Sequence, residues 1–186
     1  MKITACKLRI ITFLTILGVI GLMNFDRTQA RVPTRESASG MGSLSVQTPD
    51  GRDAKRQFSF SAHRNDDGTV QGNAVLHNPA FTGTNDQRYQ LQIDISCMQV
   101  IGNIAFFGGL TKRTNDPNLV DAVYFSVQDN GEPGKDSDLI SSVFFFDDDP
   151  TTTGDPQLCL NNQVGDFPMF PIESGNIQVR GGTTTP

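Results

Sequence analysis

Residues 57–77 read QFSFSAHRNDDGTVQGNAVLH and decide the fold class. The first part of this stretch alternates polar side chains with three apolar ones, Phe58, Phe60 and Ala62. A period of two is typical of a β-strand with one buried face. The polar run at 65–69 then predicts a turn, and a second strand follows from about Val70 to His77. The stretch as a whole predicts a β-hairpin.

The turn at 65–69 permits two registers of this hairpin. A two-residue Asp67-Gly68 turn would set Phe58 opposite His77. A three-residue loop with Gly68 in the left-handed conformation would instead give the pairs Phe58 with Leu76, Phe60 with Ala74 and Ala62 with Gly72. The second register gathers the apolar side chains on one face, so we favour it.

Similar alternation extends over most of the chain. Residues 89–95 alternate in the same way, and Gly102-Asn103 is a suitable two-residue turn into a strand at 104–111. Shorter strands are expected at 44–46, 123–127, 139–146 and 177–179. Eight short strands with short connections, and no helical period after residue 30, predict an all-β fold, either an antiparallel barrel or a two-sheet sandwich. The proline-containing segment 160–172 is expected to pack irregularly over one end of the barrel.

The first 30 residues have the order of parts found in secretory signal peptides. Basic residues at 2, 7 and 9 precede an uncharged apolar run from Ile10 to Met23, and Thr28-Gln29-Ala30 supplies small residues for cleavage. The apolar run is shorter than the roughly 20 residues that cross a bilayer. We therefore expect a signal peptide at 1–30 and a secreted or periplasmic protein. An uncut leader that acts as a membrane anchor is the alternative.

The remaining residues are expected to form one domain. The small polar residues 31–42 and the Gly/Thr-rich residues 181–186 predict flexible ends, which leaves 43–180 as a single β-domain. Loss of residues 1–30 would remove four of the 15 basic and one of the 20 acidic residues, and would change the formal charge from −5 to −8. An acidic surface without a basic cluster repels phosphates, so we expect no nucleic-acid partner and no membrane contact after cleavage.

Two cysteines remain once Cys6 has left with the leader. In an oxidising compartment, Cys97 and Cys159 are predicted to form a disulfide. Cys97 has the parity of Ile95 and lies opposite Gly108 in the expected hairpin. Its side chain is therefore predicted to point into the core.

Three short strings resemble those of a group of uncharacterised bacterial secreted β-domains. They are IDISCM at 93–98, FSVQDNG at 125–131 and SGNIQVR at 174–180. Members of the group have a signal peptide, a cysteine pair and the Asp-Asn-Gly turn. The resemblance covers most of residues 57–180 and implies a fold and a compartment. It implies no activity, ligand or catalytic residue.

The strongest candidate for a ligand site is the turn that follows residue 128. Within ten residues it holds five oxygen-bearing side chains that suit calcium, Asp129, Asn130, Glu132, Asp136 and Asp138. Their spacing differs from that of the twelve-residue EF-hand loop. A solvated turn without a metal is the alternative, because Asn, Asp, Gly and Pro favour turns on their own account.

The two histidines do not suggest a metal site. In the favoured hairpin register His63 and His77 are six strand positions apart, which is roughly 20 Å at about 3.3 Å per residue. One metal ion cannot join them at that distance. We expect no cofactor other than the calcium candidate.

The sequence carries no motif of a known catalytic site. It has no Gly-x-Ser-x-Gly elbow, phosphate loop, His-Glu-x-x-His helix or Cys-x-x-Cys pair. We therefore expect a non-enzymatic envelope or extracellular module that binds a surface partner or serves structurally. Two alternatives stay open. The 13 phenylalanines could line a lipocalin-like carrier of a small apolar ligand, and the carboxylates could supply the base of a hydrolase or isomerase.

Overall fold

The structure is a computed structural model that describes residues 35–48, 50–82, 88–116, 119–147, 149 and 151–181. They belong to one unit of the chain, Val32–Pro186. The predicted signal peptide at 1–30 and residues 182–186 of the predicted tail lie outside the described residues. The elements follow in the order β1 (Ser37–Gln47), β2 (Asp53–Arg64), β3 (Val70–Thr82), β4 (Arg88–Ile101), β5 (Ile104–Thr114), β6 (Ala122–Gln128), β7 (Leu139–Ser141), β8 (Phe144–Phe145), the 3₁₀ helix η1 (Pro156–Asn161), β9 (Met169–Pro171) and β10 (Ser174–Arg180).

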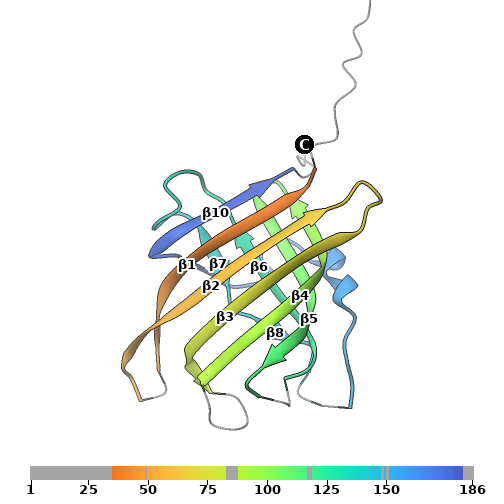
Figure 1. The fold of residues 1–186 in the computed structure, drawn as a ribbon. Helices are drawn as coiled ribbons and strands as arrows, with labels where there is room; N and C mark the ends of the chain where they lie inside the picture. The colour runs from red at the N-terminus through yellow and green to blue at the C-terminus, as the bar shows by residue number, and fades with distance from the viewer. Residues whose placement is uncertain are drawn as a thin grey trace, which may run out of the picture. The chain divides into compact units, whose positions relative to one another are not determined.

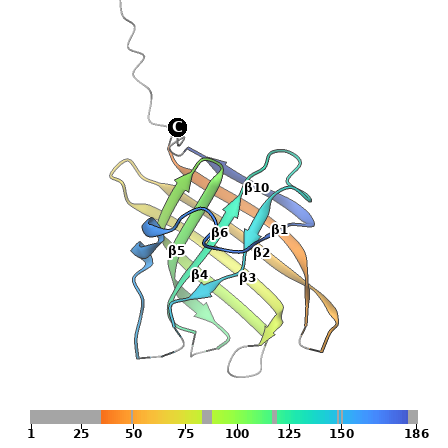
Figure 2. The ribbon, with the colours of Figure 1, turned by 180° about the vertical axis from the view of Figure 1, so that it is seen from behind.

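The strands form one antiparallel sheet. Their order across the sheet is β10-β1-β2-β3-β4-β5-β6-β7-β9, and β8 pairs with β6. The sheet curls into a half-barrel, seen from its two sides in Figures 1 and 2. The predicted all-β antiparallel fold is confirmed.

The β2–β3 hairpin has the register favoured from the sequence. The structure makes the predicted pairs, Phe58 with Leu76, Phe60 with Ala74 and Ala62 with Gly72. The main-chain N–H of Asn65 donates to the carbonyl of Thr69 at 2.7 Å, and Gly68 has a φ of 86°, the left-handed conformation that the three-residue loop needs. The turn at 102–103 also has its predicted two-residue form.

The prediction that residues 31–42 are flexible is wrong for 37–42, which form the first half of β1. This strand pairs with β2 on one side and with β10 on the other. Gly40 lies opposite Phe60, and a Cβ on Gly40 would lie 2.8 Å from the Phe60 ring. Gly42 lies beside the Phe58 ring in the same way. The phenyl rings of β2 thus fill the space that β1 leaves, so β1 needs no apolar period of its own.

A bulge in β4 changes the direction of Cys97. The register of β4 against β5 shifts between Ile95 and Cys97, so the alternation of faces slips by one residue. Met98 and Val100 then belong to the core, and Cys97 lies on the outer face. The prediction that Cys97 points into the core is therefore wrong, although Cys97 does lie opposite Gly108 as expected.

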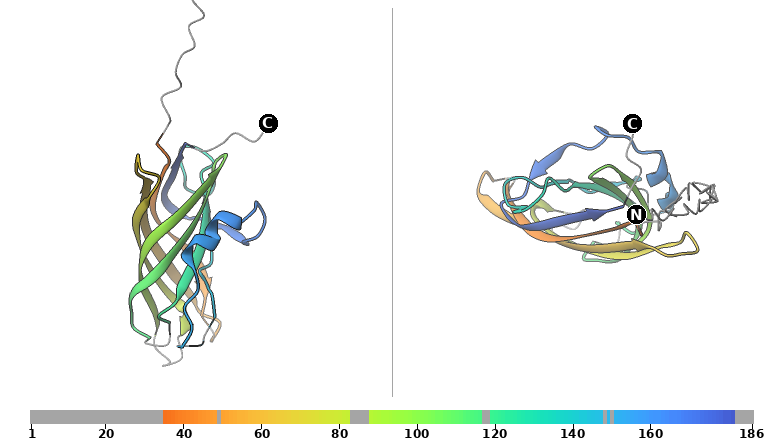
Figure 3. Two further views of the ribbon diagram at one scale, coloured as in Figure 1. Left: turned by 90° about the vertical axis from the view of Figure 1, so that its right-hand side faces the viewer. Right: turned by 90° about the horizontal axis from the view of Figure 1, so that it is seen from above.

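The predicted disulfide joins Cys97 to Cys159 of η1, with a Cα–Cα distance of 6.1 Å. Both cysteines are buried. Gly108 makes room for this contact, because a Cβ on it would lie 3.1 Å from the Cβ of Cys159 and still closer to the main chain of Pro156. The bridge fastens η1 to the outer face of the sheet. Figure 3 shows η1, in blue, beside this face.

The segment after η1 lies against the same outer wall and not over one end of the barrel, so that prediction is wrong. The ring centroid of Phe167 lies 6.2 Å from that of Phe106, an outward residue of β5 that is 1% exposed. An apolar side chain on the outer wall thus gives the segment a surface to cover. The segment ends in β9, which pairs with β7.

The strand predicted at 139–146 is interrupted in the structure. Both β7 and β8 pair with β6, and five positions separate Ile140 from Phe145, whereas four separate their partners Val127 and Val123. The extra residue bulges out of the ladder, so the stretch forms two short strands.

The interior of the half-barrel is filled by packed side chains. The ring centroids of Phe107 and Phe125 lie 4.7 Å apart, and those of Phe60 and Phe107 lie 5.4 Å apart. A guanidinium also lies inside. Arg56 of β2 is 3% exposed, and its Nη2 donates to the carbonyl of Ser141 in β7 at 2.7 Å. This bond crosses the interior and joins two strands that are not neighbours in the sheet.

The disulfide predicts a clear response to reduction. Reductant should raise the intact mass by the mass of two hydrogen atoms. Loss of a bridge that spans 62 residues should lower the free energy of unfolding by about 4 kcal/mol on the chain-entropy model. Mass spectrometry and urea unfolding with and without reductant measure the two effects. Two free thiols in protein purified without reductant would contradict the bridge.

Candidate functional site

The middle of the outer face of β10, β1, β2 and β3 carries no ionisable side chain. On β2, for example, Ser59 and Ser61 are exposed between buried core residues. We call eight outward residues of these four strands the neutral face, namely Asn176, Gln178, Ser39, Met41, Ser59, Ser61, Asn73 and Val75. Six have hydroxyl or amide side chains and two are apolar, and none is ionisable.

The register arranges the neutral face in two rows that run across the strands. One row is wholly polar and consists of Gln178, Ser39, Ser61 and Asn73, and the other consists of Asn176, Met41, Ser59 and Val75. Neighbouring strands lie about 4.8 Å apart, so each row offers a side chain about every 4.8 Å. The second row presents its apolar members to solvent, since Met41 is 66% and Val75 is 39% exposed.

A hollow of about 420 Å³ lies over the neutral face. We call four of its lining side chains, those of Ser39, Ser59, Ser61 and Asn73, the floor of the hollow. Its lining residues are Ser39, Gly40, Met41, Ser59, Phe60, Ser61, Asn73, Asn176 and Gln178. All but Gly40 and Phe60 belong to the neutral face.

The floor of the hollow offers unused hydrogen-bonding groups. In the described part of the chain, the side chains of Ser39, Ser59, Ser61 and Asn73 make no hydrogen bond to protein. Each hydroxyl can donate one hydrogen bond and accept two, and the amide can donate and accept on its two ends. These groups are therefore available to a bound partner.

Two side chains that line the hollow, Asn176 and Gln178, are held in place by residues outside it. Asn176 donates from its amide nitrogen to Glu132 at 2.7 Å and accepts from the main-chain N–H of Gly134 at 2.9 Å. Gln178 donates to the same Glu132 oxygen at 3.3 Å. Both contacts come from the loop between β6 and β7, so this loop fixes the two amides of β10 that border the hollow.

The same loop contains the residues predicted to bind calcium. Two of them attach the loop to the free edge of β10. Asp138 is fully buried, and its two oxygens accept from the main-chain N–H groups of Asn130 at 2.9 Å and Ile177 at 2.8 Å. Asp129 accepts from the N–H groups of Gly131 and Val179, both at 2.9 Å. These carboxylates thus bind N–H groups on the edge of β10 that has no strand partner. We call this contact between β10 and the loop the seam.

The other candidate ligands do not gather around one point. The amide of Asn130 donates to the carbonyl of Ser137 at 2.6 Å, and Glu132 holds the amides of β10. Asp136 is exposed, with Lys135 at 3.6 Å. Within the described residues no group of three or more His, Cys, Asp or Glu side chains is placed to hold a metal. Calcium binding stays a prediction, and an ion would have to displace these hydrogen bonds.

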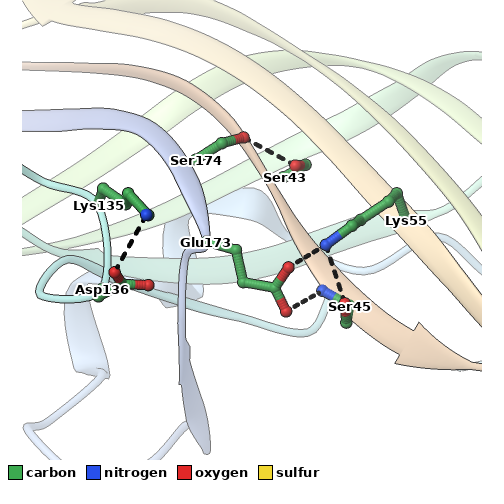
Figure 4. A network of polar contacts seen from close by, with 7 residues as sticks. All are labelled: Ser43, Ser45, Lys55, Lys135, Asp136, Glu173 and Ser174. Carbon is green, nitrogen blue, oxygen red and sulfur yellow. Dashed lines mark hydrogen bonds and ion pairs between the residues drawn. The ribbon is translucent and has the colours of Figure 1, made fainter.

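Two pairs of opposite charges lie at the border of the neutral face. Glu173, just before β10, contacts Lys55 of β2 and accepts from the main-chain N–H of Ser45 at 3.0 Å (Figure 4). The hydroxyls of Ser43 and Ser174 are hydrogen-bonded at 2.8 Å beside this pair. On the opposite border, Lys112 lies 3.1 Å from Asp94. The first pair connects β2 to the residue before β10 across β1, and the second connects the neighbouring strands β4 and β5. Each pair contributes little net charge near the hollow.

Sequence reasoning missed two features of the structure, the polar rows of the outer face and the buried guanidinium of Arg56. The alternating serines of β1 at 37, 39, 43 and 45 were a visible signal for an outward polar face, but the rows need the register of four strands. Arg56 lies two positions before Phe58 and so shares its inward face, which was a signal for a buried cation. The histidines lie as predicted, with His77 opposite Gln57 and both on the outer face.

Comparison with known proteins gives no assignment. No model of a known protein family, no curated protein and no solved structure matches the chain. The resemblance to secreted bacterial β-domains therefore stays a prediction. Over the described residues, the structure contains no helix with the length and apolarity to cross a membrane.

The buried Asp138 predicts a large effect of a small change. Asp138→Asn should lower the free energy of unfolding by about 3 kcal/mol, because an amide NH₂ would face one of the two main-chain donors. The matched control is Asp136→Asn in the same loop, at an exposed position with a φ of 64° that Asn tolerates. Its change should stay within about 0.5 kcal/mol. Equal effects of the two variants in urea unfolding would contradict the seam contact.

The ion pair of Glu173 with Lys55 predicts a lowered pKa of the Glu173 carboxyl. The hydrogen bonds from Lys55 and then Ser45 lower the pKa of Glu173 from 4.5 to about 2. Because the folded pKa is below the unfolded one, the pair stabilises the fold above about pH 4.5, and this contribution is lost as the pH falls through about 2. Carboxyl titration by NMR should show this value and a rise toward 4.5 in Lys55→Gln. A Glu173 pKa near 4.5 in the unchanged protein would contradict the contact.

Proposed function

We propose that the protein is a secreted, non-enzymatic binding module and that the neutral face is its binding surface. The observation that carries the proposal is the hollow of about 420 Å³, whose floor offers four side chains with unused hydrogen-bonding groups. Polar side chains with unused hydrogen-bonding groups in a hollow can fix the orientation of a bound partner. The predicted signal peptide and the disulfide favour an extracellular or periplasmic setting.

The interior gives less support to a carrier of apolar ligands. Such a carrier needs a lined cavity, but the side chains that would line it belong to one packed cluster. That cluster includes Phe58, Phe60, Ile93, Ile95, Val123 and Phe125. A ligand could enter only by displacing them.

Two of the three buried carboxylates, Asp121 and Asp138, give little support to a hydrolase or isomerase. A carboxylate base must face a substrate site with a second acidic group nearby. Both oxygens of Asp138 accept main-chain N–H groups, and those of Asp121 accept from Ala122, Gly154 and Asp147. These two buried carboxylates therefore organise loops.

The proposal predicts that a charge in the hollow abolishes retention of the partner. The purified domain, immobilised through its C-terminus, is exposed to culture fluid of the cells that produce it, and bound protein, glycan and lipid are analysed by mass spectrometry. Ser61→Glu should lose the bound material, because a carboxylate would fill the floor of the hollow. Ser96→Glu, at an exposed serine of β4 outside this hollow, should keep it.

Both variants should melt within a few degrees of the unchanged protein, since both serines are exposed. Material that binds equally to Ser61→Glu and to the unchanged domain would overturn the neutral face as the binding surface. The same conclusion would follow if the unchanged domain bound nothing.

A further inference from the structure

We infer that the partner of the neutral face is an uncharged polysaccharide chain that lies across the strands, along the two rows. This inference rests on the proposed function and names its ligand class. It is carried by the charge of the face, the direction and spacing of the rows, and the chemistry of the groups that they present.

The charge of the site selects an uncharged partner. None of the nine residues that line the hollow is ionisable. The charged side chains that contact its amides are Glu132 and Arg180, which have opposite signs, so the hollow has no excess charge of either sign. The chain is acidic overall, which disfavours sulfated or uronate-rich polymers. Farther from the hollow, Lys55 of β2 is paired with Glu173 and Asp94 of β4 is paired with Lys112.

The direction of the rows selects an extended polymer with polar groups along its length. The polar row crosses four strands, so its side chains span about 14 Å at about 4.8 Å between strands. An extended peptide binds sheets through their main-chain edges. On this face the main chains of β1, β2 and β3 are paired with strands on both sides, so only side chains are offered. A sugar chain instead presents hydroxyl groups at regular intervals.

The two rows differ in a way that suits a sugar ring. The polar row offers Ser39, Ser61 and Asn73 to hydroxyl groups. The second row offers exposed methyl groups of Met41 and Val75 on either side of Ser59, and these can pack against the C–H bonds of a ring. One edge of the chain would then be hydrogen-bonded while its ring face lies on apolar carbon.

The site lacks an aromatic ring on which a sugar could stack. The ligand must therefore repeat its contacts along the rows to bind well. No aromatic ring belongs to the neutral face, and Phe60 beneath it is only 5% exposed. A neutral hydrogen bond contributes about tenfold or less to affinity. A single sugar would therefore bind weakly, and a chain that repeats the contacts along the row is the fitting ligand.

Affinity electrophoresis tests the ligand class directly. The domain is run in native gels that contain hydroxyethylcellulose, galactomannan, dextran or soluble starch as neutral probes, and alginate or heparin as acidic probes. At least one neutral polymer should retard the domain, and the acidic polymers should not. The retardation should persist in 1 M NaCl at about the same strength, because screening affects charged contacts and not neutral ones.

Variants of the floor connect the retardation to the neutral face. Ser61→Glu should weaken binding at least about tenfold, and Asn73→Ala about fivefold, the factor expected for one lost neutral hydrogen bond. Ser96→Glu should bind like the unchanged domain. Melting curves of all variants show whether a loss reflects unfolding, and Asn73→Ala keeps the test valid should Ser61→Glu fold poorly.

Three results would overturn the inference, and they leave the proposed function separately testable. They are retardation by acidic polymers only, no retardation by any neutral polymer, or equal retardation of the floor variants and the unchanged domain. If the immobilised domain instead retains a protein in a Ser61-dependent manner, the ligand class is wrong while the neutral face remains the binding surface.

Discussion

The carboxylate of Asp138 connects the second edge of the last strand to the loop between β6 and β7. β10 has β1 as its strand partner, and its other edge faces the loop between β6 and β7. There Asp138 accepts the N–H of Ile177, and Asp129 accepts that of Val179. A buried N–H without a partner costs about 1 to 3 kcal/mol, so the two carboxylates replace the hydrogen bonds that a neighbouring strand would make. This edge of β10 depends on them for its hydrogen bonds.

The same seam connects the fold to the neutral face. β10 contributes Asn176 and Gln178 to the wall of the hollow, and Glu132 of the seam loop holds both amides. Any change that releases the loop should therefore free these side chains as well. Because their positions are fixed before binding, little ordering of them is needed when a partner arrives. A loop that reads as a metal site in the sequence thus serves as the support of a binding surface.

Much of the fold follows from local sequence patterns, and the exceptions have physical causes. The β2–β3 hairpin was predictable because Gly68 and the apolar alternation permit few registers. The first half of β1 was not, because rings from β2 fill the space over Gly40. The side chain of Cys97 points outward because of a one-residue bulge, and the alternation of polar and apolar residues does not reveal this bulge. The sequence marked the loop of Asp138 by its many oxygen-bearing side chains. It could not show the contact of Asp138 with Ile177, because the two residues are 39 positions apart.

Hydrogen exchange at β10 tests the seam most directly. The amide protons of Ile177 and Val179, followed one by one by NMR, should exchange as slowly as amides of the central strands β2 and β3, because carboxylates cover them. In Asp138→Asn the exchange at Ile177 should become much faster, while the amides of β2 and β3 keep their protection at mild pH. Rapid exchange of Ile177 in the unchanged protein, at the rate of an open edge strand, would contradict the account.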